Sequence, residues 1–310
     1  MRIPSSVKKT GKILMFASFG AAAAFVSATL VTGWMMVRPG KRRDDGIIRP
    51  IRHGPWHSLA LEASDGLRLH AWIHLSRKAH PNDWVLLLHG FRSNLTAVQN
   101  RSRFFSRRGY NVVLLHFRGH GGSGRSRISY GYHERKDVAA AFEFIRSLRP
   151  AEKMRVGIDG ISMGAAAAAY AVGDGLIDPD WLILESCYDN IHNALKNRLA
   201  LRFDRPLVSL ISWPLELVVE YLVQLRAEDL DPAKAIEKAR CPVLLLAGDS
   251  EPVLKTVEVE YVYGCIPEPK RLMLFPGAAH EDLLAFDPRR FAKAVGSFLR
   301  DFAPRSSISA

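Results

Sequence analysis

The sequence predicts an α/β fold: a mostly parallel central sheet with helices on both faces, a helical cap insertion and an N-terminal transmembrane helix. Three observations predict this fold. Beyond residue 80, short apolar runs alternate with longer helical stretches, which is typical of a parallel sheet covered on both sides. The stretch 13–37 contains no charged residue. Apolar residues make up 48% of the 310, which is enough for one large core beside an anchor.

The N-terminal apolar segment comes first in the chain. A helix over residues 13–37 rises about 1.5 Å per residue and is therefore long enough to cross a bilayer with some tilt. We expect 1–37 to form a basic tail and single-pass membrane anchor, followed by a basic linker over 38–56. A cleaved signal peptide is the alternative, but apolar cores of signal peptides run to only about 7–15 residues. Basic residues flank the segment equally, so the side on which the following domain lies stays open.

The net charge of +12 is concentrated beside this segment. Residues 1–52 carry +8 of it, which leaves +4 for the remainder. Such flanks attract anionic lipid headgroups, and we find no reader motif or basic face that would indicate a nucleic-acid partner. Cys187, Cys241 and Cys265 have no metal-ligand spacing and each lies beside an apolar run, so we interpret them as buried apolar residues.

The main domain is expected over 57–304, followed by a short tail over 305–310. It opens with a hairpin, because two alternating runs flank Ser64-Asp65-Gly66. Strands are expected at Trp84–Leu88, Asn111–His116, Met154–Asp159, Trp181–Glu185, Pro242–Ala247 and Arg271–Phe275. Helices are expected at about Thr96–Arg108, Glu134–Leu148, Ser162–Val172, Leu254–Cys265 and Pro288–Phe302. The alternation lapses over about 187–231, where the apolar stretch 206–226 is interrupted by Pro214, and we expect a helical cap there.

The first chemical signal is the sequence Gly160-Ile161-Ser162-Met163-Gly164. It matches G-x-S-x-G and lies between an expected strand and a helix rich in alanine. A sharp turn of this kind exposes the serine oxygen, and glycines on both sides remove clashes with Cβ atoms. We therefore predict that Ser162 is a nucleophile.

A nucleophile that attacks a carbonyl needs two N–H groups that stabilise the developing oxyanion. Met163, directly after the serine, is expected to supply one. Phe91, in the loop after the strand that ends in His89-Gly90, is expected to supply the other. We interpret His89 as a structural histidine that bonds loop backbone.

The base and the acid are expected after later strands. His280 lies in a loop after the last strand and is our candidate base. The preceding strand ends in Gly248, and the loop after it holds two carboxylates, Asp249 and Glu251. Either carboxylate could orient the imidazole, and the one that does not would cap the following helix.

The ordered set HGF, HFRGHGGSG, GISMG, LLLAGDSEPV and FPGAAHEDLL resembles the α/β-hydrolase superfamily, in the branch of serine esterases, monoglyceride-lipase-like, serine-aminopeptidase-like and depalmitoylase-like enzymes. The resemblance covers roughly residues 57–302. It departs from the family where His116 and Phe117 replace Asp and Tyr. The family's acid normally falls three residues after the strand-end glycine, and this register favours Glu251 over Asp249.

The resemblance implies a serine hydrolase that cleaves an ester or thioester through an acyl-enzyme. The expected membrane anchor and apolar cap suit an acyl-lipid or acyl-protein substrate at the bilayer. No cofactor and no metal are expected, and the oligomeric state stays open. Two alternatives remain: a non-catalytic membrane-tethered binding protein on the same fold, and a peptidase-type serine hydrolase. A dehalogenase would have a carboxylate at position 162, where this chain has serine.

Overall fold

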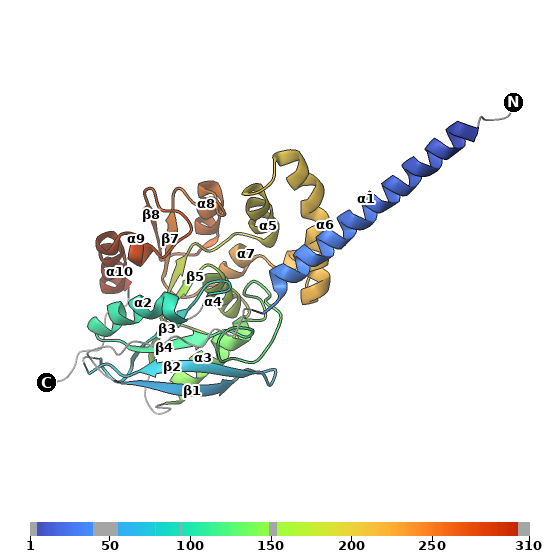
Figure 1. Cartoon of the computed structure of the whole chain (residues 1–310). Helices are drawn as coiled ribbons and strands as arrows, with labels where there is room; N and C mark the ends of the chain where they lie inside the picture. Colours follow the sequence, from blue (N-terminus) through green and yellow to red (C-terminus); the bar gives the residue numbers. More distant parts are fainter. Residues whose placement is uncertain (1–4, 40–54, 78, 94, 149–153, 303–310) are drawn as a thin grey trace.

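The protein was analysed as a computed structural model of the whole chain, which describes all residues except 1–4, 40–54, 78, 94, 149–153 and 303–310 (Figure 1). Most of the expected linker 38–56 and all of the expected tail 305–310 lie outside the described residues. The elements form one α/β body, and a long helix, α1, leads away from it toward the N-terminus (Figure 1).

One eight-stranded sheet forms the centre of the body. Its order is β1-β2-β4-β3-β5-β6-β7-β8, with β1, β2 and β4 paired antiparallel and all later pairs parallel. The strands are β1 (Trp56–Glu62), β2 (Arg68–His74), β3 (Asp83–Leu88), β4 (Asn111–His116), β5 (Arg155–Ile161), β6 (Trp181–Glu185), β7 (Val243–Gly248) and β8 (Lys270–Phe275). The expected hairpin and all six expected later strands are present, with ends that differ by at most two residues.

Two apolar cores lie on opposite faces of the sheet. Alternate side chains of β3 divide between them: Leu86 and Leu88 belong to one core, Val85 and Leu87 to the other. The first core contains residues of α3 (Arg135–Ser147), α4 (Met163–Gly173) and α8 (Thr256–Cys265). The second contains residues of α2 (Leu95–Arg107), α9 (Leu283–Phe286) and α10 (Pro288–Phe302). The strands are apolar on both faces because helices cover both, as the sequence predicts.

The segment between β6 and β7 forms α5 (Ile191–Ala200), α6 (Arg205–Val223), a 3-10 turn η1 (Ala227–Asp229) and α7 (Pro232–Ile236). The helical character expected here is present. Pro214, which interrupts the apolar stretch in the sequence, lies inside α6, and the helix runs through it without a break. Proline removes one backbone donor from a helix, and α6 nevertheless continues because its buried side packs against α5 and α1.

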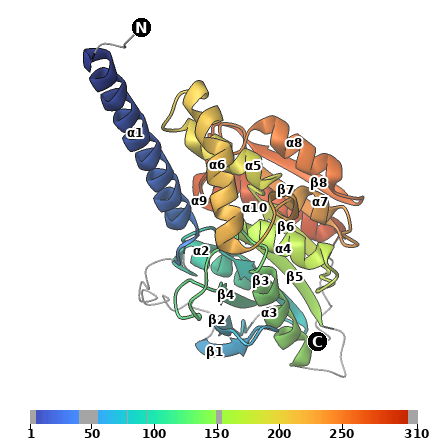
Figure 2. The ribbon, with the colours of Figure 1, turned by 90° about the vertical axis from the view of Figure 1, so that its right-hand side faces the viewer.

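Helix α1 (Ser5–Val37) joins the body at its C-terminal end (Figure 2). Val37 is fully buried, and its carbonyl accepts a hydrogen bond from Ile128 N–H at 2.8 Å. In the described part of the chain, two helices are long and apolar enough to cross a membrane by length and composition: Ser18–Val37 within α1, and α6.

The cysteines agree with the interpretation as packed apolar residues. Cys187 and Cys241 are buried and Cys265 is half-buried, and all three are free thiols. Burial raises the pKa of the Cys241 thiol to about 12, so this group is protonated at neutral pH.

Candidate active site

Ser162 occupies a strained turn between β5 and α4. Its backbone has φ +53° and ψ −113°, a left-handed conformation that side chains rarely adopt. The flanking glycines make this turn possible. A Cβ atom on Gly160 would lie 2.6 Å from the carbonyl oxygen of Gly164, and one on Gly164 would lie 2.6 Å from that of Leu88. The turn is also tied to β6, since Ser162 N–H donates to Glu185 O at 2.8 Å.

A continuous chain of hydrogen bonds joins the serine to an imidazole and a carboxylate. His280 Nε2 lies 3.1 Å from Ser162 Oγ, and His280 Nδ1 lies 2.8 Å from Glu251 Oε2. A carboxylate accepts hydrogen bonds, so Nδ1–H donates to Glu251, which leaves Nε2 to accept from the serine hydroxyl. The structure thus brings three predicted residues, from the turn after β5 and the loops after β7 and β8, into the order that proton transfer from serine requires.

The glutamate is held on its far side as well. Its side chain is fully buried, and Oε1 accepts hydrogen bonds from the Ser186 hydroxyl and from Gly248 N–H at 3.1 Å. Both carboxylate oxygens therefore have fixed partners, which orients the one that faces His280. Ser186 was not predicted from the sequence. It directly follows β6, which lies between the strands that lead to the serine and to the acid. This position in the sequence could have indicated Ser186 as a residue of the site.

Asp249, the alternative acid, points elsewhere. Its Oδ1 accepts from Gly277 N–H at 2.7 Å and from the Ser250 hydroxyl at 3.0 Å. The side chain is exposed, and it joins the loop after β7 to the loop that carries His280. Asp249 therefore contacts the backbone of that loop and not the imidazole.

A pocket of about 340 Å³ opens at Ser162, which is within the usual range for small-molecule sites. It is lined by Gly90, Phe91, Ser93, Ala97, Ile161, Ser162, Ser186, Arg198, His280, Glu281 and Asp282. The predicted donor Phe91 thus borders the pocket, and its N–H makes no hydrogen bond with any other described residue. Met163, the other predicted donor, is the first residue of α4 and follows Ser162 directly. Arg198 brings α5 of the insertion to the pocket wall.

A fully buried arginine lies beneath the site. Arg101 of α2 bonds both oxygens of Asp159 (2.9 and 3.1 Å), a carboxylate oxygen of Glu185 and Asp282 Oδ1 (2.9 Å). The network therefore connects β5, β6 and the loop two residues after His280. Burial raises the pKa of Glu185 to about 7, and the guanidinium opposes this shift. This cluster was not predicted from the sequence.

His89 has the structural role that was predicted for it. It is buried; its Nδ1 lies 2.8 Å from Gly90 O, and its Nε2 accepts a hydrogen bond from Phe117 N–H at 3.4 Å. Burial holds the pKa of His89 well below its usual range, so the ring stays neutral at physiological pH. His89 thereby connects the loop that carries Phe91 with the loop after β4.

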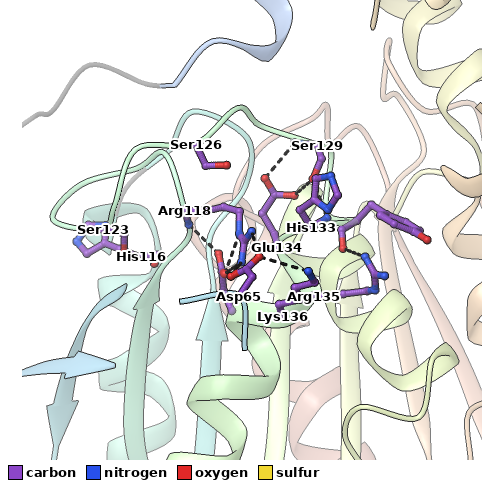
Figure 3. A network of polar contacts seen from close by, with 12 residues as sticks. Asp65, His116, Arg118, Ser123, Ser126, Ser129, His133, Glu134, Arg135 and Lys136 are labelled. Carbon is purple, nitrogen blue, oxygen red and sulfur yellow. Dashed lines mark hydrogen bonds and ion pairs between the residues drawn. The ribbon is translucent and has the colours of Figure 1, made fainter. Parts of the chain in front are cut away.

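The loop after β4 is braced by buried ion pairs (Figure 3). Arg118 pairs with Asp137 of α3 at 2.6 Å and with Asp65 in the β1–β2 turn at 2.8 Å. Hydrogen bonding from Arg118 lowers the pKa of Asp65 to about 2. Glu134 accepts hydrogen bonds from the backbone and the hydroxyl of Ser129 in the same loop. These contacts account for the position of Arg118, so no role in ligand binding is needed to explain it.

Among the residues that the structure describes, no group of three or more His, Cys, Asp or Glu side chains is arranged to hold a metal ion. The polar groups around the pocket form the serine–histidine–carboxylate chain and the buried network beneath it.

Together, the sheet order, the strained serine turn and the loops that converge on it define an α/β hydrolase. Residues 79–233 match the family model for the serine aminopeptidases of family S33. Because this match spans half of the chain, the chain belongs to that family of α/β hydrolases.

Curated relatives and solved structures agree with this assignment. The uncharacterized protein YqkD of Bacillus subtilis is 26% identical over 231 residues, which cover 73% of each chain. The α/β hydrolase domain-containing protein WAV2 of Arabidopsis thaliana is 23% identical over 94% of this chain and 95% of its own. An esterase of Pyrococcus furiosus superimposes with a TM-score of 0.69 at 21% identity, covering 86% of this chain and 98% of its own. An acylaminoacyl peptidase of Pyrococcus horikoshii gives 0.61 at 16% identity, over 84% of this chain and 43% of its own. At such identities the structural likeness concerns the fold.

Proposed function

We propose that the protein is a serine hydrolase that cleaves a carboxylic ester or thioester through an acyl-enzyme. The observation that carries the proposal is the chain of hydrogen bonds from Ser162 through His280 to Glu251, of which Ser162 and His280 line a pocket. Structural similarity to the Pyrococcus furiosus esterase adds support for an ester substrate.

In the proposed first step, His280 Nε2 takes the proton of the Ser162 hydroxyl while Oγ attacks the carbonyl carbon of the substrate. Glu251 holds the ring with Nδ1–H toward itself and stabilises the imidazolium that forms. The backbone N–H groups of Phe91 and Met163 stabilise the oxyanion of the tetrahedral intermediate. His280 then gives the proton to the leaving alcohol or thiol, and the carbon–heteroatom bond breaks.

In the second step, His280 takes a proton from water as the water oxygen attacks the acyl-enzyme. Collapse of the second intermediate releases the carboxylic acid and returns the proton to Ser162. Glu251 keeps the same position throughout, because Ser186 and Gly248 fix its other oxygen.

The chemistry is tested by hydrolysis of p-nitrophenyl esters and acyl thioesters of increasing chain length by the purified full chain. We expect turnover that falls to background in Ser162→Ala. The matched control is Ser126→Ala, which removes an exposed hydroxyl in the loop after β4 that donates to the carbonyl oxygen of the neighbouring Arg127. Equal turnover by native protein and Ser162→Ala would refute the proposed nucleophile.

Peptide hydrolysis is a second candidate, because the family match is to serine aminopeptidases. The two candidates share the serine, the base and the oxyanion donors, and differ in the leaving group that His280 must protonate. Comparison of kcat/KM for an ester and the amide of the same acyl group separates them. An amide cleaved as fast as the ester would favour the peptidase.

We further propose that α1 anchors the protein in a membrane and that the insertion 187–231 acts as a cap over the pocket. For the anchor, the support is the apolar stretch Ser18–Val37, of which 11% is buried in the protein. Arg198 on the pocket wall supports the cap. Both features suit an acyl-lipid or acyl-protein substrate that is held at the bilayer surface.

The anchor is tested by flotation of the full chain with phospholipid vesicles after alkaline extraction. The double variant Ala23→Arg, Phe25→Arg is expected to leave the vesicles, because each central arginine opposes insertion by about 2.5–3.5 kcal/mol. The control places the same two charges at Val257 and Tyr261, which are exposed on α8. Flotation of the α1 double variant at the native level would contradict the anchor.

A further inference from the structure

Helix α6 presents an apolar face that the rest of the protein leaves uncovered. Its members recur every three or four residues and are 41–81% exposed; they are Leu207, Leu210, Trp213, Leu217 and Tyr221. We call these five residues the α6 outer face. With 3.6 residues per turn, such spacing places them along one side of the helix. Leu201 and Phe203 extend the exposed apolar surface into the turn before α6.

This face lies next to α1. The buried side of α6 includes Leu215, which forms a small core with Leu199 of α5 and Met36 of α1. The helices are so close that a Cβ atom on Gly33 of α1 would lie 2.4 Å from Val218 Cγ1. On its other flank the outer face meets polar residues, among them Glu216, which is bonded to His192 at 2.8 Å. The apolar face is therefore continuous with α1 on one side and ends at a polar border on the other.

The packing of α6 against α1 fixes the position of α6 along the length of the candidate anchor. Thr29, Gly33 and Val37 mark the packed side of α1, which is otherwise largely exposed from residue 18 onward. The packed residues span about 12 Å at 1.5 Å per residue, at the end of a segment that could cross a hydrocarbon core of about 30 Å. Helix α6 thus lies beside the last turns of the segment, at the level of one membrane–water interface.

Helix α6 also passes the length and composition test for a membrane span, but its ends are tied to the body. At its C-terminal end, Leu222 O accepts a hydrogen bond from Arg127 at 2.5 Å and Val223 O lies 3.3 Å from His133 Nε2. Its N-terminal end follows α5, which lines the pocket through Arg198. Because both ends of α6 connect to the same domain, we infer that α6 stays on that domain's side of the bilayer and does not cross it.

We propose that the α6 outer face inserts into the interfacial region of the bilayer that α1 spans. Helices of this kind bury an apolar face about 5–10 Å into the boundary between headgroups and acyl chains. Trp213 and Tyr221 are suited to that depth, because their rings combine an apolar body with a polar group. The pocket mouth, bordered by α5 and by the loop of Phe91, then faces the membrane surface. Arg92 of that loop donates a hydrogen bond to Met35 O of α1, which couples the loop to the anchor.

The inference rests on the proposed anchor and is independent of the proposed chemistry, so its test uses no turnover. The full chain is reconstituted in phosphatidylcholine vesicles with brominated acyl chains, which quench tryptophan fluorescence on contact. We expect the native protein to show a quenched component that Trp213→Phe lacks. The matched control is Val257→Trp in the Trp213→Phe background, since Val257 is exposed on α8 and lies outside the α6 outer face. We expect no quenching at position 257.

Each other outcome overturns the proposal at a different point. Protein that does not float with the vesicles refutes the anchor, and insertion of α6 with it. Protein that floats but shows no quenching of Trp213 refutes insertion while the anchor stands. If Trp213→Cys in a Cys265→Ser background forms disulfide-linked dimers in the same vesicles without quenching, the outer face binds a second copy of the chain.

Discussion

Replacement of Arg101 by methionine is expected to destabilise the folded protein strongly. The guanidinium is fully buried and pairs with Asp159 and Glu185, whose side chains are equally buried, and with Asp282, which is 22% exposed. Methionine fills a similar volume but leaves two buried carboxylates without a cation. Removal of one partner from a buried ion pair typically costs about 3–5 kcal/mol.

That range is a large part of the stability of an ordinary domain, about 5–15 kcal/mol. The loss should depend on pH, because burial raises the pKa of Glu185 to about 7 even with the arginine present. A carboxyl whose pKa is raised in the folded state favours folding at low pH, where it is protonated, and loses that contribution as pH rises through the folded pKa. The deficit of Arg101→Met is therefore expected to grow as pH rises through about 7, where Glu185 of the native protein loses its proton and Arg101 offsets the resulting charge.

Urea unfolding followed by circular dichroism measures the effect. The matched control is Arg107→Met, an exposed arginine in the last turn of the same helix, which should change stability by less than about 0.5 kcal/mol. Adding Glu185→Gln to Arg101→Met should recover part of the loss, because it removes one uncompensated charge. If Arg101→Met unfolds at the same urea concentration as Arg107→Met, the network does not hold the site together and the reasoning is wrong.

Three further predictions concern single residues. Glu251→Gln should lower kcat/KM for ester hydrolysis by about a thousandfold or more, and Asp249→Asn by less than about tenfold, because only Glu251 orients His280. Asp65→Asn should reduce stability near neutral pH by no more than about 1 kcal/mol. In urea unfolding this difference should disappear as pH falls from about 4 toward 2, because the pKa of Asp65 is lowered to about 2. Gly164→Ala should destabilise the protein by about 1–3 kcal/mol and lower its activity, because the new Cβ would meet Leu88 O.

Each of these predictions has an outcome that would contradict it. A greater loss of activity in Asp249→Asn than in Glu251→Gln would reverse our choice of acid. An Asp65→Asn deficit that persists unchanged at acid pH would show that the pair with Arg118 is not its cause. For Gly164→Ala, the control is Gly264→Ala on α8, where nothing lies within 4 Å of the new atom. Equal stability of the two alanine variants would refute a close approach at Gly164.

Much of the fold followed from the sequence because the parallel strands are apolar on both faces. Runs such as Trp84–Leu88 and Trp181–Glu185 are apolar at successive positions, which indicates strands that are buried on both faces. Their alternation with helical stretches therefore predicted a parallel sheet. The course of α6 was harder to predict. Proline usually interrupts a helix, and only its tertiary contacts with α5 and α1 show why α6 continues through Pro214.

Three residues of the site were predicted from the sequence because each belongs to a sequence pattern in a loop that follows a strand. Ser162, His280 and Glu251 come from three different loops, and the structure brings them within hydrogen-bonding distance. Arg101 escaped prediction because it lies inside a helix, and only the packing of α2 on the sheet brings it under the site. Ser186 escaped because a single serine after a strand has many possible roles, and its bond to Glu251 depends on a neighbouring strand.

We propose that Ser162 is a nucleophile activated by His280. Labelling of the full chain with a fluorophosphonate probe, followed by mass spectrometry of the modified peptide, tests this role. We expect one adduct, on Ser162, that is lost in Ser162→Ala and forms far more slowly in His280→Ala. A folded, monodisperse protein that takes no label, or that carries the label on another residue, would contradict it.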